Sequence, residues 1–198
     1  DCRVERGRRV ALVGPSGSGK STLLHLFAGL DTATVGEVIW PALGGADALR
    51  PGPVAVIFQG PSLLPPLTVT ENVALPLVLG GLRDSAARGA ATVALAQLEL
   101  EALADKLPEE LSGGQAQRVA IARALAGCPS LILADEPTGQ LDHVNAAAVV
   151  DLLLATADRT GAGLVVATHD TAVAERLPET WQMRDGRLTQ DAQEELGC

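Results

Sequence analysis

Residues 14–22 constrain the fold of this chain more than any other segment, because they read Gly-Pro-Ser-Gly-Ser-Gly-Lys-Ser-Thr. The segment fits the pattern G-x-x-x-x-G-K-[ST], in which glycines let the backbone approach a phosphate chain and exposed N–H groups bind its oxygens. Lys20 adds a positive charge at the β- and γ-phosphates, and the Ser21 hydroxyl can ligate Mg²⁺. The whole loop is therefore expected to bind nucleotide phosphates: Gly14, Pro15, Ser16, Gly17, Ser18, Gly19, Lys20, Ser21 and Thr22.

The segments on both sides of the loop support this interpretation. Residues 9–13 form a short apolar run of strand length, and residues 21–28 follow with apolar side chains at helical spacing. A strand, a glycine-rich loop and a helix N-terminus together form an anion site. The alternative is a glycine-rich turn that matches the pattern by chance, and the flanking strand and helix argue against it.

Apolar runs of strand length alternate with helical segments along the rest of the chain. The pattern predicts a single domain with a mostly parallel α/β core (about residues 1–60 and 128–198) that is interrupted by a helical insertion (about 61–127). Strands are expected at residues 9–13, 36–40, 54–58, 131–134 and 164–167, followed by a hairpin over 181–188 that turns at Asp185-Gly186.

Helix starts can be placed by their capping patterns. Thr68 and Glu71 form a capping box that opens a helix, which Pro76 is expected to kink or end. Ser112 and Gln115 form a second capping box. Further helices are expected at residues 86–98 and 144–157.

Charge and cysteine content exclude several classes of protein. The net charge is −9, with 24 acidic against 15 basic residues, which disfavours a nucleic-acid partner held by phosphate contacts. The three cysteines lack C-x-x-C spacing, which favours a reducing compartment over a disulfide framework or zinc site. Cys128 is expected to be a small buried hydrophobe. No signal peptide and no run of about 18 uncharged apolar residues is found, so no membrane span is expected.

Polar residues follow the predicted strands where ligands gather in open α/β sheets. Asp135 is expected to hold Mg²⁺, and Glu136 to polarise a water for in-line attack; the alternative is a solvated strand end. A histidine considered without its context is more often structural than catalytic, but the position of His169 after a buried strand favours a catalytic role. Gln59 ends another strand, which by itself is a weak signal.

The sequence Leu-Ser-Gly-Gly-Gln at residues 111–115 matches the signature motif of ATP-binding-cassette (ABC) ATPases. Together with the other motifs of that family it stands in the family's order, and the resemblance covers nearly the whole chain. Residues 14–21 resemble its Walker A motif, Gln59 its Q-loop, residues 131–135 its Walker B motif, Glu136 its catalytic carboxylate, residues 139–142 its D-loop and His169 its switch histidine.

This resemblance implies a P-loop NTPase with a RecA-like core, an inserted helical subdomain, and a head-to-tail dimer that closes on two molecules of ATP. The dimer is expected to be a homodimer, or a pseudo-dimer with a related ATPase. Catalysis would fall to Glu136, His169 and Gln59, and Mg²⁺ would be held by Ser21, Gln59 and Asp135. The facing copy would contact ATP through Ser112, Gly113, Gly114, Gln115 and Asp142.

A narrower resemblance lies in residues 58–77, which are similar to the ATPases of lipoprotein-release, macrolide-export and cell-division-type systems. It implies an ATPase subunit at the cytoplasmic face of the cell membrane, coupled to a membrane permease whose helix docks in a groove; alternatively, these apolar residues only pack the insertion.

Two other functions remain open. One is a nucleotide switch that regulates a membrane partner without transport, and the other is an ABC ATPase of DNA repair, chromosome organisation or translation. The absence of a coiled-coil insertion, zinc cysteines and a second cassette argues against the latter.

The chain departs from the family pattern in three places. No aromatic residue precedes Walker A to stack on adenine, so either the start of the chain, which begins at Asp1, is missing or the base is held otherwise. The segment between Glu37 and Val54 is short beside the family's antiparallel β part, which is therefore expected to be reduced. Gln140 replaces the usual Asn or Ala of the D-loop.

Overall fold

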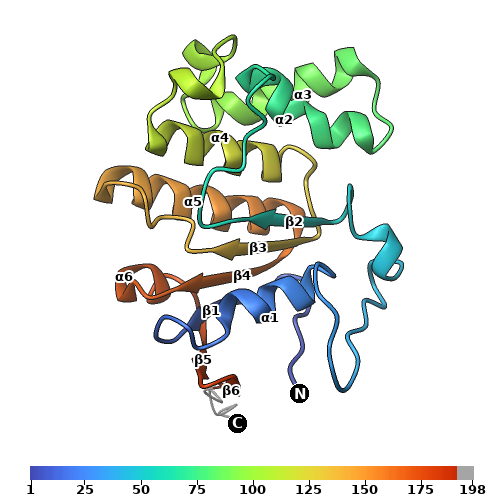
Figure 1. The fold of residues 1–198 in the computed structure, drawn as a ribbon, viewed down its shortest axis with the longest axis vertical. Coiled ribbons are helices and arrows are strands. Elements are labelled where there is room, and N and C mark those ends of the chain that lie inside the picture. The colour runs from blue at the N-terminus through green and yellow to red at the C-terminus, as the bar shows by residue number, and fades with distance from the viewer. Residues whose placement is uncertain (191–198) are drawn as a thin grey trace.

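A six-stranded sheet forms the centre of the molecule (Figure 1). The structure is a computed structural model that describes residues 1–190, apart from the side chains of His143 and Gln190. The strand order is β2-β3-β4-β1-β5-β6, parallel except for the antiparallel pair β5 and β6. The α/β fold expected from the sequence is thus confirmed. The strands are β1 (Arg9–Val13), β2 (Val54–Ile57), β3 (Leu131–Asp135), β4 (Gly163–Thr168), β5 (Glu179–Arg184) and β6 (Arg187–Gln190).

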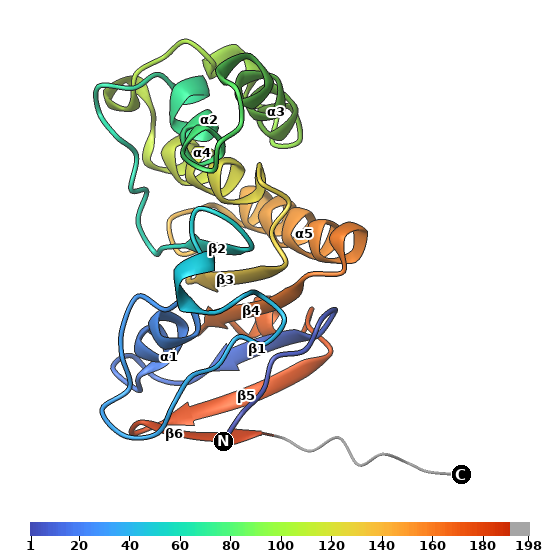
Figure 2. The same ribbon diagram turned by 90° about the vertical axis from the view of Figure 1, so that its right-hand side faces the viewer.

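Helices cover both faces of the sheet, which is why its strands read as continuous apolar runs. Alternate residues of β1 point to opposite faces: Val10 and Leu12 pack in the cluster that contains Leu24 of α1 (Lys20–Phe27). Ala11 lies in the cluster on the other face, with Leu153 of α5 (His143–Thr160). Figure 2 shows α1 and α5 on opposite sides of the sheet. The short helix α6 (Thr171–Ala174) follows β4.

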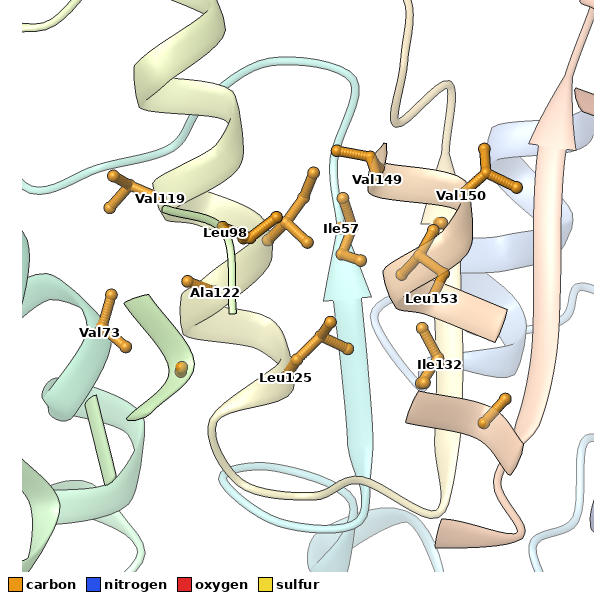
Figure 3. Packing of buried hydrophobic residues seen from close by; sticks show 14 of the residues in the cluster. Ile57, Val73, Leu98, Val119, Ala122, Leu125, Ile132, Val149, Val150 and Leu153 are labelled. Atoms are coloured by element: carbon orange, nitrogen blue, oxygen red, sulfur yellow. The ribbon is translucent and has the colours of Figure 1, made fainter. Parts of the chain in front are cut away.

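The predicted insertion forms a helical part at one end of the molecule, beyond the edge strand β2 (Figures 1 and 2). Side chains from α4, α5 and the strand β2 meet in one apolar cluster between this part and the sheet (Figure 3). None of the helices within residues 1–190 has both the length and the hydropathy to cross a bilayer. The helical part contains α2 (Val69–Leu79), α3 (Asp84–Ala96), α4 (Gly113–Leu125) and two short 3₁₀ helices, Glu101–Leu103 and Pro108–Glu110.

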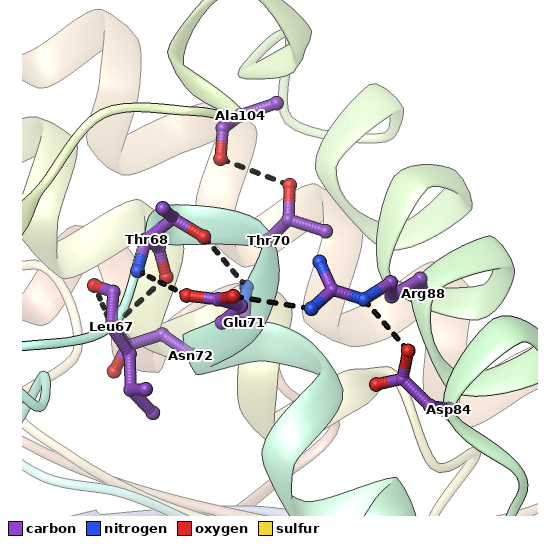
Figure 4. Close-up of polar contacts among 8 residues, drawn as sticks. All are labelled: Leu67, Thr68, Thr70, Glu71, Asn72, Asp84, Arg88 and Ala104. Carbon is purple, nitrogen blue, oxygen red and sulfur yellow. Dashed lines mark hydrogen bonds and ion pairs between the residues drawn. The ribbon is translucent and has the colours of Figure 1, made fainter.

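The start of α2 is held by the capping box that the sequence predicts (Figure 4). Thr68 Oγ1 accepts from the N–H of Glu71 at 3.3 Å, and a Glu71 carboxylate oxygen accepts from the N–H of Thr68 at 2.9 Å. Arg88 of α3 donates to Glu71 at 3.1 Å and to Asp84 at 3.0 Å. The N–H of Thr68, and then Arg88, hold the pKa of the Glu71 carboxyl below its usual value. The cap therefore also ties α2 to α3.

The sequence predicts that Pro76 either kinks or ends α2. The helix does not end there, because it continues to Leu79. A proline within a helix removes one N–H from the helical ladder and crowds the carbonyl four residues earlier, but its own carbonyl can still accept a hydrogen bond. The carbonyl of Pro76 still accepts from the N–H of Gly80 at 2.9 Å, so the last turn remains bonded.

The prediction of a strand at residues 36–40 is wrong, because this segment is irregular and pairs with no strand of the sheet. Ile39 within it is 68% exposed, and the neighbouring Val35 is 90% exposed, so the run covers no sheet face. Trp40 instead packs on α1 and donates from its indole N–H to the Phe27 carbonyl at 2.8 Å. The segment then passes through a 3₁₀ helix, Ala46–Ala48, to β2.

Cys128 is exposed, so the prediction that it is buried is wrong. It lies in the turn between α4 and β3 and adopts a left-handed φ of 49°. A connection between elements runs over the surface, where a small apolar side chain gains no burial.

Candidate functional site

A cavity of about 510 Å³ opens at the carboxyl ends of the parallel strands. Its residues come from the ends of β1, β2, β3 and β4, or from the segments that follow these strands, including the start of α1. These ends lie at one edge because parallel strands end there together. Every residue that lines it was expected from the sequence to belong to the site. They are Ser16, Gly17, Gly19, Lys20, Ser21, Thr22, Gln59, Asp135, Glu136 and His169.

The glycines of the loop after β1 are required by backbone geometry and by close packing. Gly17 and Gly19 have φ values of 78° and 104°, which favour glycine. A Cβ on Gly14 would lie 2.1 Å from the Met183 carbonyl oxygen. The N–H of Gly186 donates to the Ser18 carbonyl at 3.0 Å. The β5–β6 hairpin therefore forms a rear wall against which the phosphate loop is packed.

Lys20 begins α1 at the floor of the cavity and is 8% exposed. Its ammonium donates to the carbonyls of Gly14 at 2.8 Å and Pro15 at 3.1 Å. No carboxylate among residues 1–190 forms an ion pair with it. Its charge is thus held in place by neutral carbonyls, which leaves it free to attract an anion.

The carboxylate of Glu136 and the imidazole of His169 meet across the cavity. Glu136 Oε1 lies 2.8 Å from Nδ1 of His169, although 33 residues separate the two along the chain. Glu136 is 8% exposed and has a left-handed φ of 46°, and its N–H donates to the Ala167 carbonyl at 2.9 Å. A left-handed residue other than glycine costs about 1–2 kcal/mol, so the surrounding structure must hold Glu136 in this position. The His169 side chain is 73% exposed and can move toward a ligand.

Asp135 ends β3 beside Glu136 and is largely buried. Within the described residues, no group of three or more His, Cys, Asp or Glu side chains could hold a metal ion by itself. Ser21, Gln59 and Asp135, each of which carries a side-chain oxygen, nevertheless line one cavity. Mg²⁺ commonly binds through one or two protein oxygens, waters and substrate phosphates. The residues therefore fit an ion that enters with a nucleotide.

The predicted residues of the signature motif and D-loop lie outside this cavity. Ser112 caps α4: its hydroxyl accepts from the N–H of Gln115 at 3.2 Å, and Gln115 Oε1 accepts from the N–H of Ser112 at 2.9 Å. Gly113 is exposed and Gly114 is half-buried. Within one copy of the chain, these residues are therefore not part of the cavity formed around the phosphate loop. Gly14, Pro15 and Ser18 also do not line the cavity, because they form the back of the loop.

Asp142 caps α5 rather than lining the cavity. Its Oδ1 accepts from the N–H of Asn145 at 2.9 Å, and that backbone hydrogen bond is the main reason why the pKa of its carboxyl lies below the usual value. The side chain is exposed, so its capping role leaves it accessible to a partner.

Two contributors to the site were missed by sequence reasoning. Met183 packs behind the phosphate loop. It lies in a hairpin far from the loop along the chain, so no local sequence pattern indicates this contact. Gln117 lies on the buried side of α4 between Ala116 and Val119. A glutamine within an apolar helix face was the signal that could have found it.

A second hollow of about 800 Å³ lies between the sheet edge and the helical part. Its walls are mostly apolar, with Phe58 and Leu79 partly exposed. Arg123 lines it as well and donates to the Ser62 carbonyl at 2.8 Å and to the Ser62 hydroxyl at 2.7 Å. Burial lowers the pKa of this guanidinium. We refer to this hollow as the apolar groove.

Known proteins resemble this chain over most of its length. The model of the ABC transporter family matches residues 1–139. A structure described as a dimeric, post-hydrolysis state of the ATP-binding cassette MJ0796 bound to ADP and Pi is 39% identical, with a TM-score of 0.87 over 96% of this chain and 88% of that chain. The structure of cbiO1 from Clostridium perfringens, described as part of the ABC transporter complex cbiONQ, is 30% identical, with a TM-score of 0.80 over 95% of this chain and 78% of that one.

Proposed function

This chain belongs to the ABC transporter family and is an ATPase cassette, and from that premise we propose that it is the subunit that powers a membrane permease. In this proposal, ATP closes two copies head to tail, hydrolysis separates them, and the movement is passed to the permease. The observation that carries it is the convergence of Lys20, Asp135, Glu136 and His169 on one cavity. Fold resemblance alone would not support a mechanism, because function depends on the site.

Binding is assigned to the phosphate loop. Its N–H groups, at the N-terminus of α1, surround the phosphates, and Lys20 neutralises their charge. Ser21, Gln59 and Asp135 are the residues that would hold Mg²⁺. When bound, the ion would supply positive charge that neutralises the phosphates.

Hydrolysis is assigned to Glu136 and His169. Because Oε1 of Glu136 is engaged by His169, Oε2 is the oxygen that we assign to polarising the attacking water. The exposed imidazole of His169 orients this carboxylate and can contact the terminal phosphate. Such catalysis depends on placing a water in line and stabilising charge, rather than on covalent chemistry.

The trans arrangement is supported by the capped N-terminus of α4. This helix has 13 residues, and its N-terminus, with exposed Ser112 and Gly113, presents N–H groups that suit a phosphate. The MJ0796 structure is described as dimeric and bound to ADP and Pi. A homodimer, or a pseudo-dimer with a related ATPase, would complete each site with the partner's signature motif.

The apolar groove is the surface that we assign to a permease helix. Exposed Leu79 and Phe58 offer apolar area for a helix to bury, and the groove adjoins the segment that follows Gln59. A permease helix bound there would place the chain at the cytoplasmic face of the membrane as a peripheral subunit. It would also make the helical part, about residues 61–127, the subdomain that moves with the permease.

A nucleotide switch without transport is the second candidate. The observation that favours it is the irregular segment before β2, where the family's antiparallel β part is reduced. A multi-span permease encoded next to this chain would favour transport over the switch.

The proposal is tested with Glu136→Gln, which keeps the shape of the side chain and removes its negative charge. We expect ATP turnover to fall by about 10² to 10⁴-fold, the usual contribution of a positioned acid or base, while ATP binding stays within about threefold. Turnover and equilibrium binding of ATP are measured on the same preparation. Unchanged turnover would remove Glu136 from its assigned role.

A further inference from the structure

Gln117 is a buried amide that connects three parts of the site. It is 1% exposed, in the second turn of α4. Its Nε2 donates to the Phe58 carbonyl at 3.2 Å and lies 3.5 Å from the Pro137 carbonyl. Both contacts involve carbonyl oxygens, which only accept, so the NH₂ end of the amide must face them. The orientation of the side chain is therefore determined by its neighbours.

The two carbonyls belong to backbone next to the predicted catalytic residues. Phe58 directly precedes Gln59, and Pro137 directly follows Glu136; both Gln59 and Glu136 line the phosphate cavity. The Phe58 side chain lines the apolar groove. Gln117 itself lies five residues after Ser112, about 7.5 Å along α4. One amide thus links the signature end of α4 to both sides of the catalytic cavity.

The geometry of this link makes it sensitive to small movements of α4. Donor–acceptor distances of 3.2 and 3.5 Å lie at the long end of the range for N–H···O bonds, where strength changes steeply with distance and alignment. A displacement of α4 relative to the two carbonyls would change both distances. Packed helices shift as rigid bodies between discrete positions, so the amide would follow α4.

The other end of the amide adds an independent observation. Gln117 Oε1 is buried and has no hydrogen-bond partner among the described residues. An unsatisfied buried acceptor costs free energy. A second position that gives Oε1 a donor would be stabilised relative to this one.

We propose that Gln117 is a positioning residue that couples the two ATP sites of the dimer. Contact of the signature motif with the facing copy's ATP moves α4, and Gln117 passes this movement to Gln59 and Glu136 of its own site. The inference rests on the proposed head-to-tail dimer. It adds a route by which each ATP site responds to ATP bound at the other site. The same amide also contacts Phe58, which lines the apolar groove.

The test uses Gln117→Met, which keeps the length and burial of the side chain but removes the donor. The matched control is Gln97→Met, the same exchange at an exposed position at the end of α3. Steady-state ATP turnover is measured against ATP concentration, together with ATP affinity, ATP-driven dimerisation and Tm. For Gln117→Met we expect ATP affinity within about threefold, kcat reduced by about tenfold or more, and a Hill coefficient that falls from near two, the number of sites, toward one.

A second variant separates coupling from folding. Gln117→Glu places an ionised carboxylate against two carbonyls, and protonation restores one O–H donor. Its turnover relative to the wild type should therefore recover as the pH falls. Tm measured at each pH separates the two causes, because a purely structural defect would be relieved together with the loss of folding stability. Cooperative turnover that persists in Gln117→Met, or a Gln117→Glu defect that does not change with pH, would overturn the inference alone. Wild-type protein that neither dimerises with ATP nor shows cooperativity would overturn the proposed dimer and the inference with it.

Discussion

Gly14→Ala is expected to damage nucleotide binding through a contact that lies behind the phosphate loop. The added Cβ would lie 2.1 Å from the Met183 carbonyl oxygen and 2.8 Å from Ser18 Oγ. Real Cβ atoms essentially never come closer than 3.0 Å to such neighbours, so the loop and the hairpin must separate by about 1 Å. The Met183 carbonyl belongs to the backbone of β5, which pairs with β1 through Gln182 and with β6 at Met183, so the loop is the part that moves.

The size of the effect follows from this displacement. A misplacement of about 1 Å at a reacting group costs about 10²-fold in rate, which corresponds to about 2.7 kcal/mol. Overpacking a well-packed site also costs about 1–3 kcal/mol of folding stability. We therefore expect kcat/KM for ATP to fall by about 10²-fold and Tm to fall with it.

The assay compares Gly14→Ala with Gly89→Ala, because the same substitution has opposite consequences at the two positions. Gly89 lies in the exposed middle of α3, where a Cβ would meet nothing within 4 Å, so alanine should stabilise the helix by about 0.5–1 kcal/mol. ATP affinity, turnover and Tm are measured for both. If Gly14→Ala keeps kcat/KM within about threefold of the wild type, the packing of the loop on β5 does not control binding, and the reasoning is wrong.

Two further predictions concern the dimer and the helical part. Ser112→Arg should block ATP-driven dimerisation by filling the exposed helix N-terminus, while ATP binding to the single chain stays unchanged; a dimer in size-exclusion chromatography with ATP would refute the trans arrangement. Glu71→Gln should destabilise the protein above the unfolded-state pKa of a glutamate, since the folded-state pKa is lowered and the charged form is the one that is stabilised. The Tm difference between wild type and Glu71→Gln should shrink as the pH falls through that folded-state pKa, and a difference that is constant with pH would contradict the assigned role of the carboxylate.

The features that the sequence determined are those encoded by residues close together in the chain. The loop of residues 14–22, the caps at Thr68 and Ser112, and the turn at Asp185-Gly186 each depend on a few neighbouring side chains and backbone angles. Strand ends could also be placed, because a buried parallel strand reads as an apolar run that stops at a polar residue. The convergence of those ends at one edge of the sheet then follows from parallel pairing.

The apolar run at residues 36–40 shows the limit of such patterns. Its composition suits a strand, but a strand exists only if another strand pairs with it, and none of the described strands does so. Cys128 shows the same limit for burial, because its residue type suits the interior while its place in a turn leaves it exposed.

Tertiary structure alone decided how distant residues meet. The 2.8 Å contact of Glu136 with His169 spans 33 residues, and the bond from Gln117 to the Phe58 carbonyl spans 59. The Met183 carbonyl of β5 occupies the space that a Cβ on Gly14, directly after β1, would need. Local patterns limit which groups can act in a site, but distances of this kind depend on how whole elements pack, and packing is settled by all of their side chains together.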